Sequence, residues 1–211
     1  YTLSNVNLKT GRIANGVPSK VAFTAGVQGN QPKLNLAIDA KTQLTFDLDQ
    51  QTYALAGLAL EMKGEGARIT NLALKAGRDV TAKLKTAEFA TNKLSVAMTG
   101  MSGRDNLDVK LDAPKLNFTA DKATGDKVTV VAKISGPQGA TNLNLVLPGV
   151  EGTAQAFKSA AMTLDLDIKQ GDQTVKAKVM SPVAGNIKTQ QLSLAQLKAS
   201  IPARGPNLPG N

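Results

Sequence analysis

Apolar and polar residues alternate along most of this chain, and this period of two constrains the fold more than any other feature. Successive side chains of a β-strand point to opposite faces, so each alternating stretch has one apolar and one polar face. Prolines such as Pro114 and Pro182 are predicted to mark strand boundaries. The clearest stretches are Leu34/Leu36/Ile38, Leu44/Phe46/Leu48, Leu94/Val96/Met98, Leu107/Val109/Leu111, Leu116/Phe118, Leu143/Leu145/Leu147 and Met162/Leu164/Leu166/Ile168.

A hairpin around Gly171-Asp172 is predicted by its register. A two-residue turn there sets apolar residues opposite one another, and it sets acids opposite lysines on the other face. A slip of one residue would spoil both faces at once. The predicted pairs are Ile168 with Val175, Leu166 with Ala177, Leu164 with Val179, Asp167 with Lys176 and Asp165 with Lys178.

A second hairpin is predicted between residues 68–75 and the stretch from Asp79 onward. The three-residue loop Ala76-Gly77-Arg78 would pair Leu74 with Val80, Leu72 with Ala82, and Lys75 with Asp79. Gly77 could supply the positive φ that such a loop often needs.

These patterns predict an all-β fold, an extended and twisted antiparallel meander that curves into a groove or a sandwich-like layer. Turn signals recur every ~10–15 residues, which suggests a dozen or more strands of roughly six to eight residues. At most one or two short helices are expected, because only residues 151–161 and 191–200 are ambiguous. Residues 1–211 are expected to form a single unit.

The composition argues against an enzyme. The chain has no cysteine and no histidine, so the commonest nucleophiles and bases are missing, and no metal or cofactor is expected. The carboxylate pairs Asp47/Asp49 and Asp165/Asp167 lie at i, i+2, which puts each pair on the polar face of a strand. No aromatic residue lies beside a basic cluster, as single-strand nucleic-acid binding would need.

The net charge of +9 is spread along the strands, where lysines alternate with acids. Scattered charge of this kind is typical of a solvated face. A weak attraction to anionic lipid head groups is the alternative.

The apolar faces can fill a sandwich core, or they can line a trough that an apolar ligand occupies. Their side chains are mostly Leu, Val, Ile and Ala, which are small for a sandwich core and suggest spare room. Both interpretations stay open. The candidate lipid-contacting residues are Leu34, Leu36, Ile38, Leu44, Phe46, Leu48, Leu94, Val96, Met98, Leu107, Val109, Leu111, Leu164, Leu166 and Ile168.

Short motifs in a consistent order resemble the AsmA family of bacterial envelope proteins. They are Leu8–Pro18 (LKTGRIANGVP), Leu44–Asp49 (LTFDLD), Tyr53–Leu58 (YALAGL), Leu111–Leu116 (LDAPKL), Leu164–Asp167 (LDLD), Ser181–Ile187 (SPVAGNI) and, after a Leu-x-Leu strand, Pro206–Gly210 (PNLPG). The likeness covers most of the chain.

The resemblance implies a non-enzymatic periplasmic segment, part of a larger protein that an N-terminal helix, missing from this chain, tethers to the inner membrane. It implies a role in outer-membrane biogenesis, with phospholipid acyl chains carried along an apolar β-groove. Envelope proteins are the other expected partners, and nucleic acid is not expected. The rival hypothesis is a structural or protein-interaction β-scaffold in outer-membrane assembly, because exposed edge strands invite pairing.

Overall fold

The computed structural model describes residues 1–14, 17–66, 68–86, 88–119, 121–153, 155–186, 189–201 and 203–204, and these residues contain strands and turns but no helix. The strands are β1 (Thr2–Thr10), β2 (Ile13–Ala14), β3 (Val17–Pro18), β4 (Val21–Asn30), β5 (Lys33–Asp47), β6 (Thr52–Gly66), β7 (Ile69–Lys83), β8 (Glu88–Ser102), β9 (Asp105–Phe118), β10 (Ala123–Gly125), β11 (Val128–Gly136), β12 (Gly139–Leu147), β13 (Val150–Thr153), β14 (Ala156–Gln170), β15 (Gln173–Asn186), β16 (Gln191–Leu194), β17 (Lys198–Ser200) and β18 (Ala203–Arg204).

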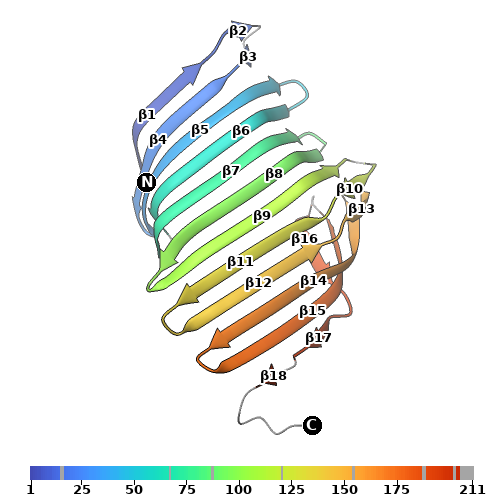
Figure 1. The fold of residues 1–211 in the computed structure, drawn as a ribbon. Coiled ribbons are helices and arrows are strands. Elements are labelled where there is room, and N and C mark those ends of the chain that lie inside the picture. Colours follow the sequence, from blue (N-terminus) through green and yellow to red (C-terminus); the bar gives the residue numbers. More distant parts are fainter. Residues whose placement is uncertain are drawn as a thin grey trace.

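The strands form one 16-stranded antiparallel sheet in which chain order is also spatial order, as a meander requires (Figure 1). β10 and β11 act as one interrupted strand, since both pair with β9 in the same register. β12 and β13 form the next interrupted strand. The small β2–β3 sheet prolongs the hairpin of β1 and β4, joined to it by the hydrogen bond from Gly11 N to Lys20 O at 2.8 Å.

The predicted hairpin at Gly171-Asp172 is confirmed at every pair. Gly171 has φ +57°, as the first central residue of a type II′ turn does. On the polar face, Nζ of Lys176 lies 3.6 Å from Asp167, and Nζ of Lys178 lies 3.7 Å from Asp165. Apolar and charged cross-strand pairs therefore select the same register.

The predicted hairpin at Ala76-Gly77-Arg78 is wrong, because β7 runs without a turn from Ile69 to Lys83. Leu74 pairs with Met62 and Met98 on the flanking strands rather than with Val80. The feature at these residues is an irregularity in the pairing with β8, where Arg78 has φ +103°. Alternation continues on both sides of it, so the strand has apolar partners along its whole length.

The strands are also longer than predicted. β5 to β8 and β14 have 15 residues each. Pro114 and Pro182 lie inside β9 and β15 rather than at their boundaries. The ambiguous stretches 151–161 and 191–200 contain parts of β13, β14, β16 and β17. The physical reason is that irregularities interrupt the pairing locally, while the strand continues beyond them.

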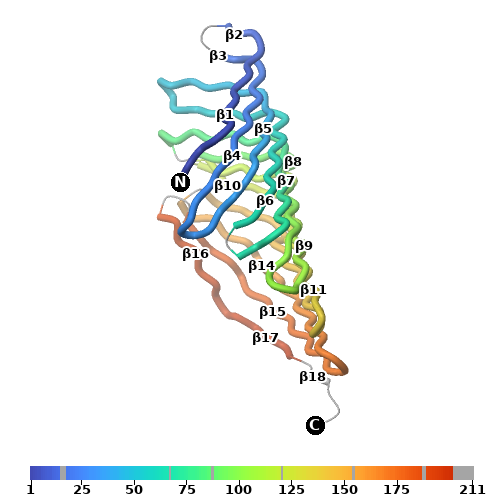
Figure 2. Tube along the Cα trace, turned by 90° about the vertical axis from the view of Figure 1, so that its left-hand side faces the viewer, coloured from blue at the N-terminus to red at the C-terminus, as the bar shows by residue number. Residues whose placement is uncertain are grey.

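These irregularities form a row across the sheet, which we call the bulge row. It comprises the register shifts beside Thr42, Gly57, Arg78 and Ala160, together with Pro114 and the break at Pro148-Gly149. An extra residue in a strand bends it and increases its twist. The strands accordingly bend along their length, and the meander curves into a partial ring, as the edge-on view shows (Figure 2).

The sheet is a single open layer in the part of the chain that the structure describes. Its accessible surface is 13893 Å², whereas a compact monomer of 21.9 kDa would expose about 9,300 Å². The excess follows from the architecture, because one face of the sheet has no second layer of side chains over it. Of the two forms expected from the sequence, the chain adopts the curved open layer rather than a filled sandwich.

The turn at Gly171 provides a test of the β14–β15 register. We expect Gly171→Val to destabilise the protein by about 1–2 kcal/mol, because a side chain with a β-branch is strained at positive φ. Gly171→Asn should cost less, since asparagine tolerates this conformation, and no atom lies within 4 Å of a Cβ built at Gly171. Urea denaturation measures both variants, and equal stabilities would contradict the assigned turn.

Candidate functional site

The main feature of the sheet is a series of apolar ladders, rows of residues directly opposite one another on neighbouring strands. The central ladder crosses from β1 to β17 without a polar member. It consists of Leu8, Phe23, Ala40, Leu60, Ala76, Val96, Leu111, Val130, Leu145, Leu164, Val179 and Ala199. With strands spaced ~4.8 Å apart, it extends for about 50 Å along the sheet.

A second ladder lies two residues along each strand from the central one and therefore on the same face. It comprises Ala25, Ile38, Met62, Leu74, Met98, Val109, Ala132, Leu143, Leu166 and Ala177. Two parallel rows of aliphatic side chains thus form a continuous strip across most of the sheet.

An aromatic ladder lies beyond the bulge row. It contains every aromatic residue of the chain except Tyr1 and Phe23, and its members are Phe46, Tyr53, Ala82, Phe89, Phe118, Ala123, Gly152, Phe157, Gly185 and Leu192. The rings lie beside small residues, and Phe157 packs so closely on Gly185 that a Cβ there would lie 2.5 Å from the ring.

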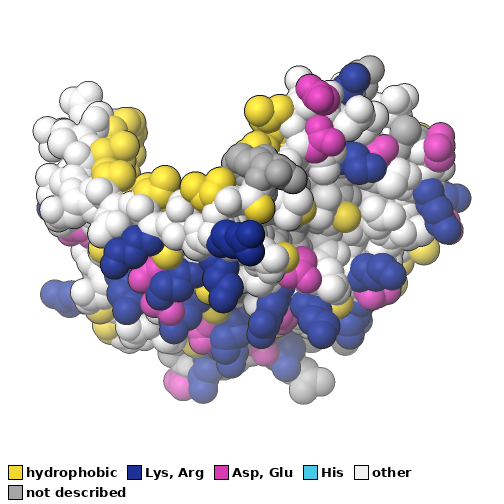
Figure 3. Space-filling view, turned by 90° about the horizontal axis from the view of Figure 1, so that it is seen from above, with side chains coloured by type: hydrophobic (Ala, Val, Ile, Leu, Met, Phe, Trp, Pro, Cys, Tyr) yellow, Lys and Arg dark blue, Asp and Glu magenta, His cyan; other side chains and the backbone are white. Residues whose placement is uncertain are grey.

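The aromatic ladder shows which face is concave. Phe118 on β9 and Phe157 on β14 are separated by three strand spacings, or about 14 Å in a flat sheet. Their ring centroids are only 5.4 Å apart, at an interplanar angle of 72°. The sheet must therefore curve toward the side that carries the rings. The space-filling view shows apolar side chains inside the hollow and charged side chains outside it (Figure 3).

The predicted candidate residues lie together on this concave face, with Leu48 as the exception. Leu48 is in the turn after β5 and is 67% exposed. Leu36 is buried, and the other candidates are partly exposed. Partial exposure is what a single layer leaves, because neighbouring side chains cover the flanks of each residue and no described residue covers its tip.

Sequence reasoning missed Leu60 and Met62, which continue the central and second ladders on β6, and it missed Leu58 beside them. The run Tyr53–Leu60 has no simple alternation. Gly57, with φ +60°, adds one residue at the bulge row and changes which positions face inward. Tyr53 and Leu55 face the hollow before the glycine, and Leu58 and Leu60 face it afterwards. A glycine at which apolar periodicity shifts by one residue is the signal that could have found them.

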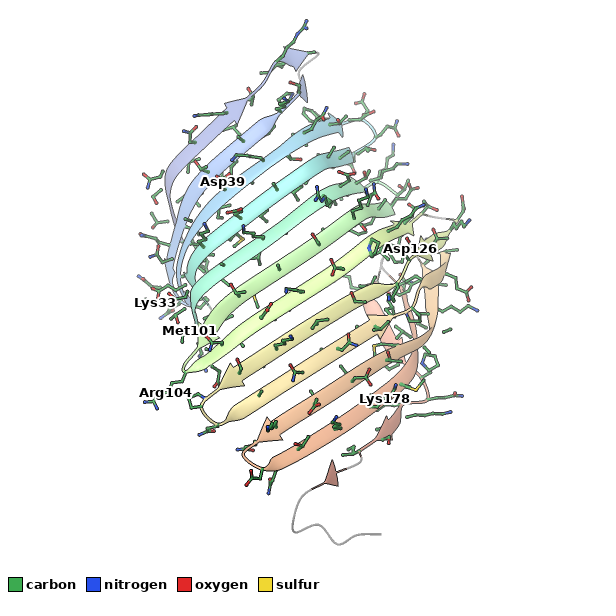
Figure 4. The ribbon with its side chains drawn as sticks, viewed as in Figure 1. Lys33, Asp39, Met101, Arg104, Asp126 and Lys178 are labelled. Atoms are coloured by element: carbon green, nitrogen blue, oxygen red, sulfur yellow. The ribbon has the colours of Figure 1, made fainter. Side chains whose placement is uncertain are left out.

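The outer face is charged, and several of its acids are paired with lysines, among them Asp39, Glu61, Asp165 and Asp167. Figure 4 looks onto this face, with Asp39 and Lys178 near opposite ends of the sheet. Glu61 lies 3.2 Å from Nζ of Lys75 and 3.7 Å from Nζ of Lys63. The hydrogen bond from Lys75 and the charge of Lys75 hold the pKa of the Glu61 carboxyl below its ordinary 4.5. Desolvation opposes them, and Lys63 adds a smaller lowering effect.

Asp47, Asp165 and Asp167 have structural partners, whereas Asp49 lies in the turn after β5 rather than on the polar face of a strand. Asp165 and Asp167 pair with the lysines of β15, and Asp47 accepts a hydrogen bond from Gln50 N at 3.0 Å. The described residues contain no group of three or more acids, histidines or cysteines that could hold a metal ion. They also include no helix of the length and apolarity needed to cross a membrane. The arrangement can bury apolar groups.

The aromatic ladder provides a test of the curvature. Phe118 is 8% exposed and packs in a cluster with Ala123, Val150 and Phe157. We expect Phe118→Ala to destabilise the protein by about 3–5 kcal/mol. Tyr53→Ala, in the same ladder but at a position 36% exposed, is the matched control with a smaller expected loss. Urea denaturation compares the two, and equal losses would contradict closer packing at β9–β14.

The paired acids of the outer face lead to a pH prediction. Because the pKa of Glu61 is lowered in the folded protein, its contribution to stability is present above pH ~4.5 and is lost as the pH falls through the folded pKa. We expect Lys75→Met to raise this pKa toward its ordinary value, and Lys178→Met to leave it unchanged. A carbon-13 titration of the side-chain carboxyl measures both, and an unchanged midpoint in Lys75→Met would contradict the assigned cause.

No family model, curated protein sequence or solved structure matches this chain.

Proposed function

We propose that the concave apolar face is a trough for phospholipid acyl chains, and that the chain is a non-enzymatic segment that helps to carry lipid between the inner and outer membranes. One observation carries this proposal. The central ladder is apolar on each strand that it crosses between β1 and β17, on a side of the sheet that no second layer covers in the described part of the chain. An uncovered apolar surface of this extent on a protein commonly marks a binding surface.

The energetics support a hydrocarbon ligand. Transfer of each methylene from water to an apolar surface contributes about 0.8 kcal/mol, so a ~16-carbon chain gains on the order of 10 kcal/mol before ordering costs. The strip of about 50 Å, estimated from strand spacing, offers room for more than one extended acyl chain in line. A bound ligand also covers apolar side chains that are half exposed in the free protein, and this burial would stabilise the folded sheet.

The side chains of the strip favour an acyl chain that slides along the sheet over one that is held at a single position. The central and second ladders contain only aliphatic side chains, methionine and Phe23. Without polar groups to fix a register, a chain bound at one place gains about as much one strand further along. A surface with this property suits a conduit better than a site that must hold a ligand in a single pose.

The cellular setting belongs to the same proposal. The resemblance to the AsmA family supports a bacterial periplasm, with the segment tethered to the inner membrane by a part of the protein outside this sequence. The outward-facing ion pairs fit an aqueous compartment, since exposed pairs such as Lys75 with Glu61 remain solvated.

A second candidate function is a β-scaffold that binds an envelope protein, and the β1 edge favours it. In the described residues, β1 pairs with β4 on one side and with no strand on the other. Leu3 is 63% exposed and Leu8 is 62% exposed along this edge. A long edge strand with exposed apolar side chains can accept a strand from another chain.

We expect a charge in the central ladder to abolish lipid binding. Leu111→Glu and Val130→Glu put carboxylates opposite each other in the middle of the strip, where an acyl chain would have to desolvate them. Lys110→Glu is the matched control, on the same strand but on the outer face. Native mass spectrometry after gentle extraction, with binding of a fluorescent acyl probe, measures the effect.

The outcomes separate the two candidates. Phospholipid that co-purifies with the parent chain and with Lys110→Glu, but not with the double variant, supports the trough. Protein free of lipid that instead retains a defined envelope protein, lost when β1 is altered, supports the scaffold and contradicts the conduit. Equal lipid binding in all variants would mean that acyl chains do not occupy the central ladder.

A further inference from the structure

We infer that a cavity on the outer face, between β1, β4, β5 and β6, binds a phosphate group. The cavity has a volume of about 530 Å³ and is lined by Lys9, Thr10, Gly11, Lys20, Val21, Ala22, Lys41, Thr42, Gln43, Ala56 and Gly57. Its lining contains three lysines and no carboxylate. It lies on the opposite side of the sheet from the apolar ladders, so this inference does not rest on the proposed function.

The register brings the three lysines around one small residue. Lys9 and Lys41 both pair with Ala22, from the two neighbouring strands, which puts their Cα atoms about 10 Å apart. Lys20 lies two residues before Ala22 on the same face, about 7 Å along the strand. Lysine side chains are long and flexible enough for all three ammonium groups to converge on a single ligand.

Small residues leave space for that ligand. Ala22 and Ala56 carry only a methyl group, and no atom lies within 4 Å of a Cβ built at Gly57. The cavity is therefore open above the backbone. A compact polyanion such as a phosphate fits between the ammonium groups, which supply strong charge-assisted hydrogen bonds.

The nearby acids leave two of the lysines uncommitted. Asp39 pairs with Lys41 at 3.7 Å. Asp79 accepts hydrogen bonds from Gly57 N at 2.8 Å and from Asn92 Nδ2 at 3.4 Å. Neither Lys9 nor Lys20 has a carboxylate within ion-pair distance among the described residues.

A second cavity on the outer face also contains lysines, but its lysines are paired with acids. The one between β12, β14 and β15, of about 510 Å³, is lined by Lys176 and Lys178 but also by Asp165 and Asp167, which neutralise them. Internal pairing at that site leaves little attraction for an anion. The lysine cavity at Ala22 has one such pair, Lys41 with Asp39, and its other two lysines leave it with a net positive charge.

The experiment is a titration of the folded chain with inorganic phosphate, followed by the backbone amide signals in NMR. We expect saturable shifts confined to the cavity, in residues such as Gly11, Ala22 and Gly57. Lys9→Gln/Lys20→Gln/Lys41→Gln should weaken the apparent affinity about tenfold or more, which corresponds to about 1.4 kcal/mol. Lys122→Gln/Lys127→Gln/Lys133→Gln loses the same charge elsewhere and should change it less than about twofold.

A second variant keeps the test independent of lysine loss. Ala22→Glu introduces a carboxylate between Lys9 and Lys41, where it pairs with both, and should abolish phosphate binding without removing a lysine. Shifts that never saturate, that spread over all lysine-bearing strands, or that sodium chloride reproduces at equal ionic strength would overturn the inference.

The source of the phosphate is distinguished by sedimentation with vesicles. Vesicles of phosphatidylglycerol and phosphatidylcholine, compared with vesicles of phosphatidylcholine alone, test a lipid head group as the ligand. Binding to the anionic vesicles that Ala22→Glu abolishes identifies a membrane head group. Saturable binding of inorganic phosphate without vesicle binding identifies a soluble phosphorylated ligand.

Discussion

Cross-strand register determines which side chains of this sheet face the hollow and which face outward. Each side chain of the sheet points either into the hollow or outward. Residues that pair directly on neighbouring strands point to the same side, so the register of each pair of strands fixes the side for the next strand. The central ladder stays apolar over about 50 Å, as estimated from strand spacing, only because each pair of strands keeps its neighbours in phase. Charged pairs on the outer face reinforce the same phase, as Asp165 with Lys178 illustrates.

The bulge row converts this flat pattern into a curved one. Without an extra residue, a strand of 15 residues would continue straight, and the apolar side chains at its two ends would not face a common hollow. The additional residue at Gly57, and its equivalents on the other strands, bends the chain while returning apolar side chains to the inner face. The 5.4 Å contact between Phe118 and Phe157 is the consequence. Curvature and apolarity therefore coincide on one side of the sheet.

Local patterns predicted the fold class and much of the concave face. The turn at Gly171 and the pairs around it could be predicted because apolar and charged residues select one register there. The errors occurred where a bulge resembles a turn. Gly77-Arg78 has the composition of a hairpin loop, but only pairing with Leu58 and Ser95 on the flanking strands shows that β7 continues. The residues around Leu60 were missed for a related reason, because the extra residue of a bulge shifts the alternation of apolar and polar residues by one position.

Contacts between strands are almost entirely between sequence neighbours, since the sheet is a meander. Such a molecule behaves as a one-dimensional chain of coupled units, as repeat proteins do. Its stability is then a sum of neighbour terms, and protection of backbone amides against exchange should fall gradually from the packed strands β8 to β14 toward the edges. The same architecture allows a hairpin to be added or deleted in the middle without changing the remaining interfaces, so the length of the sheet is open to evolutionary adjustment.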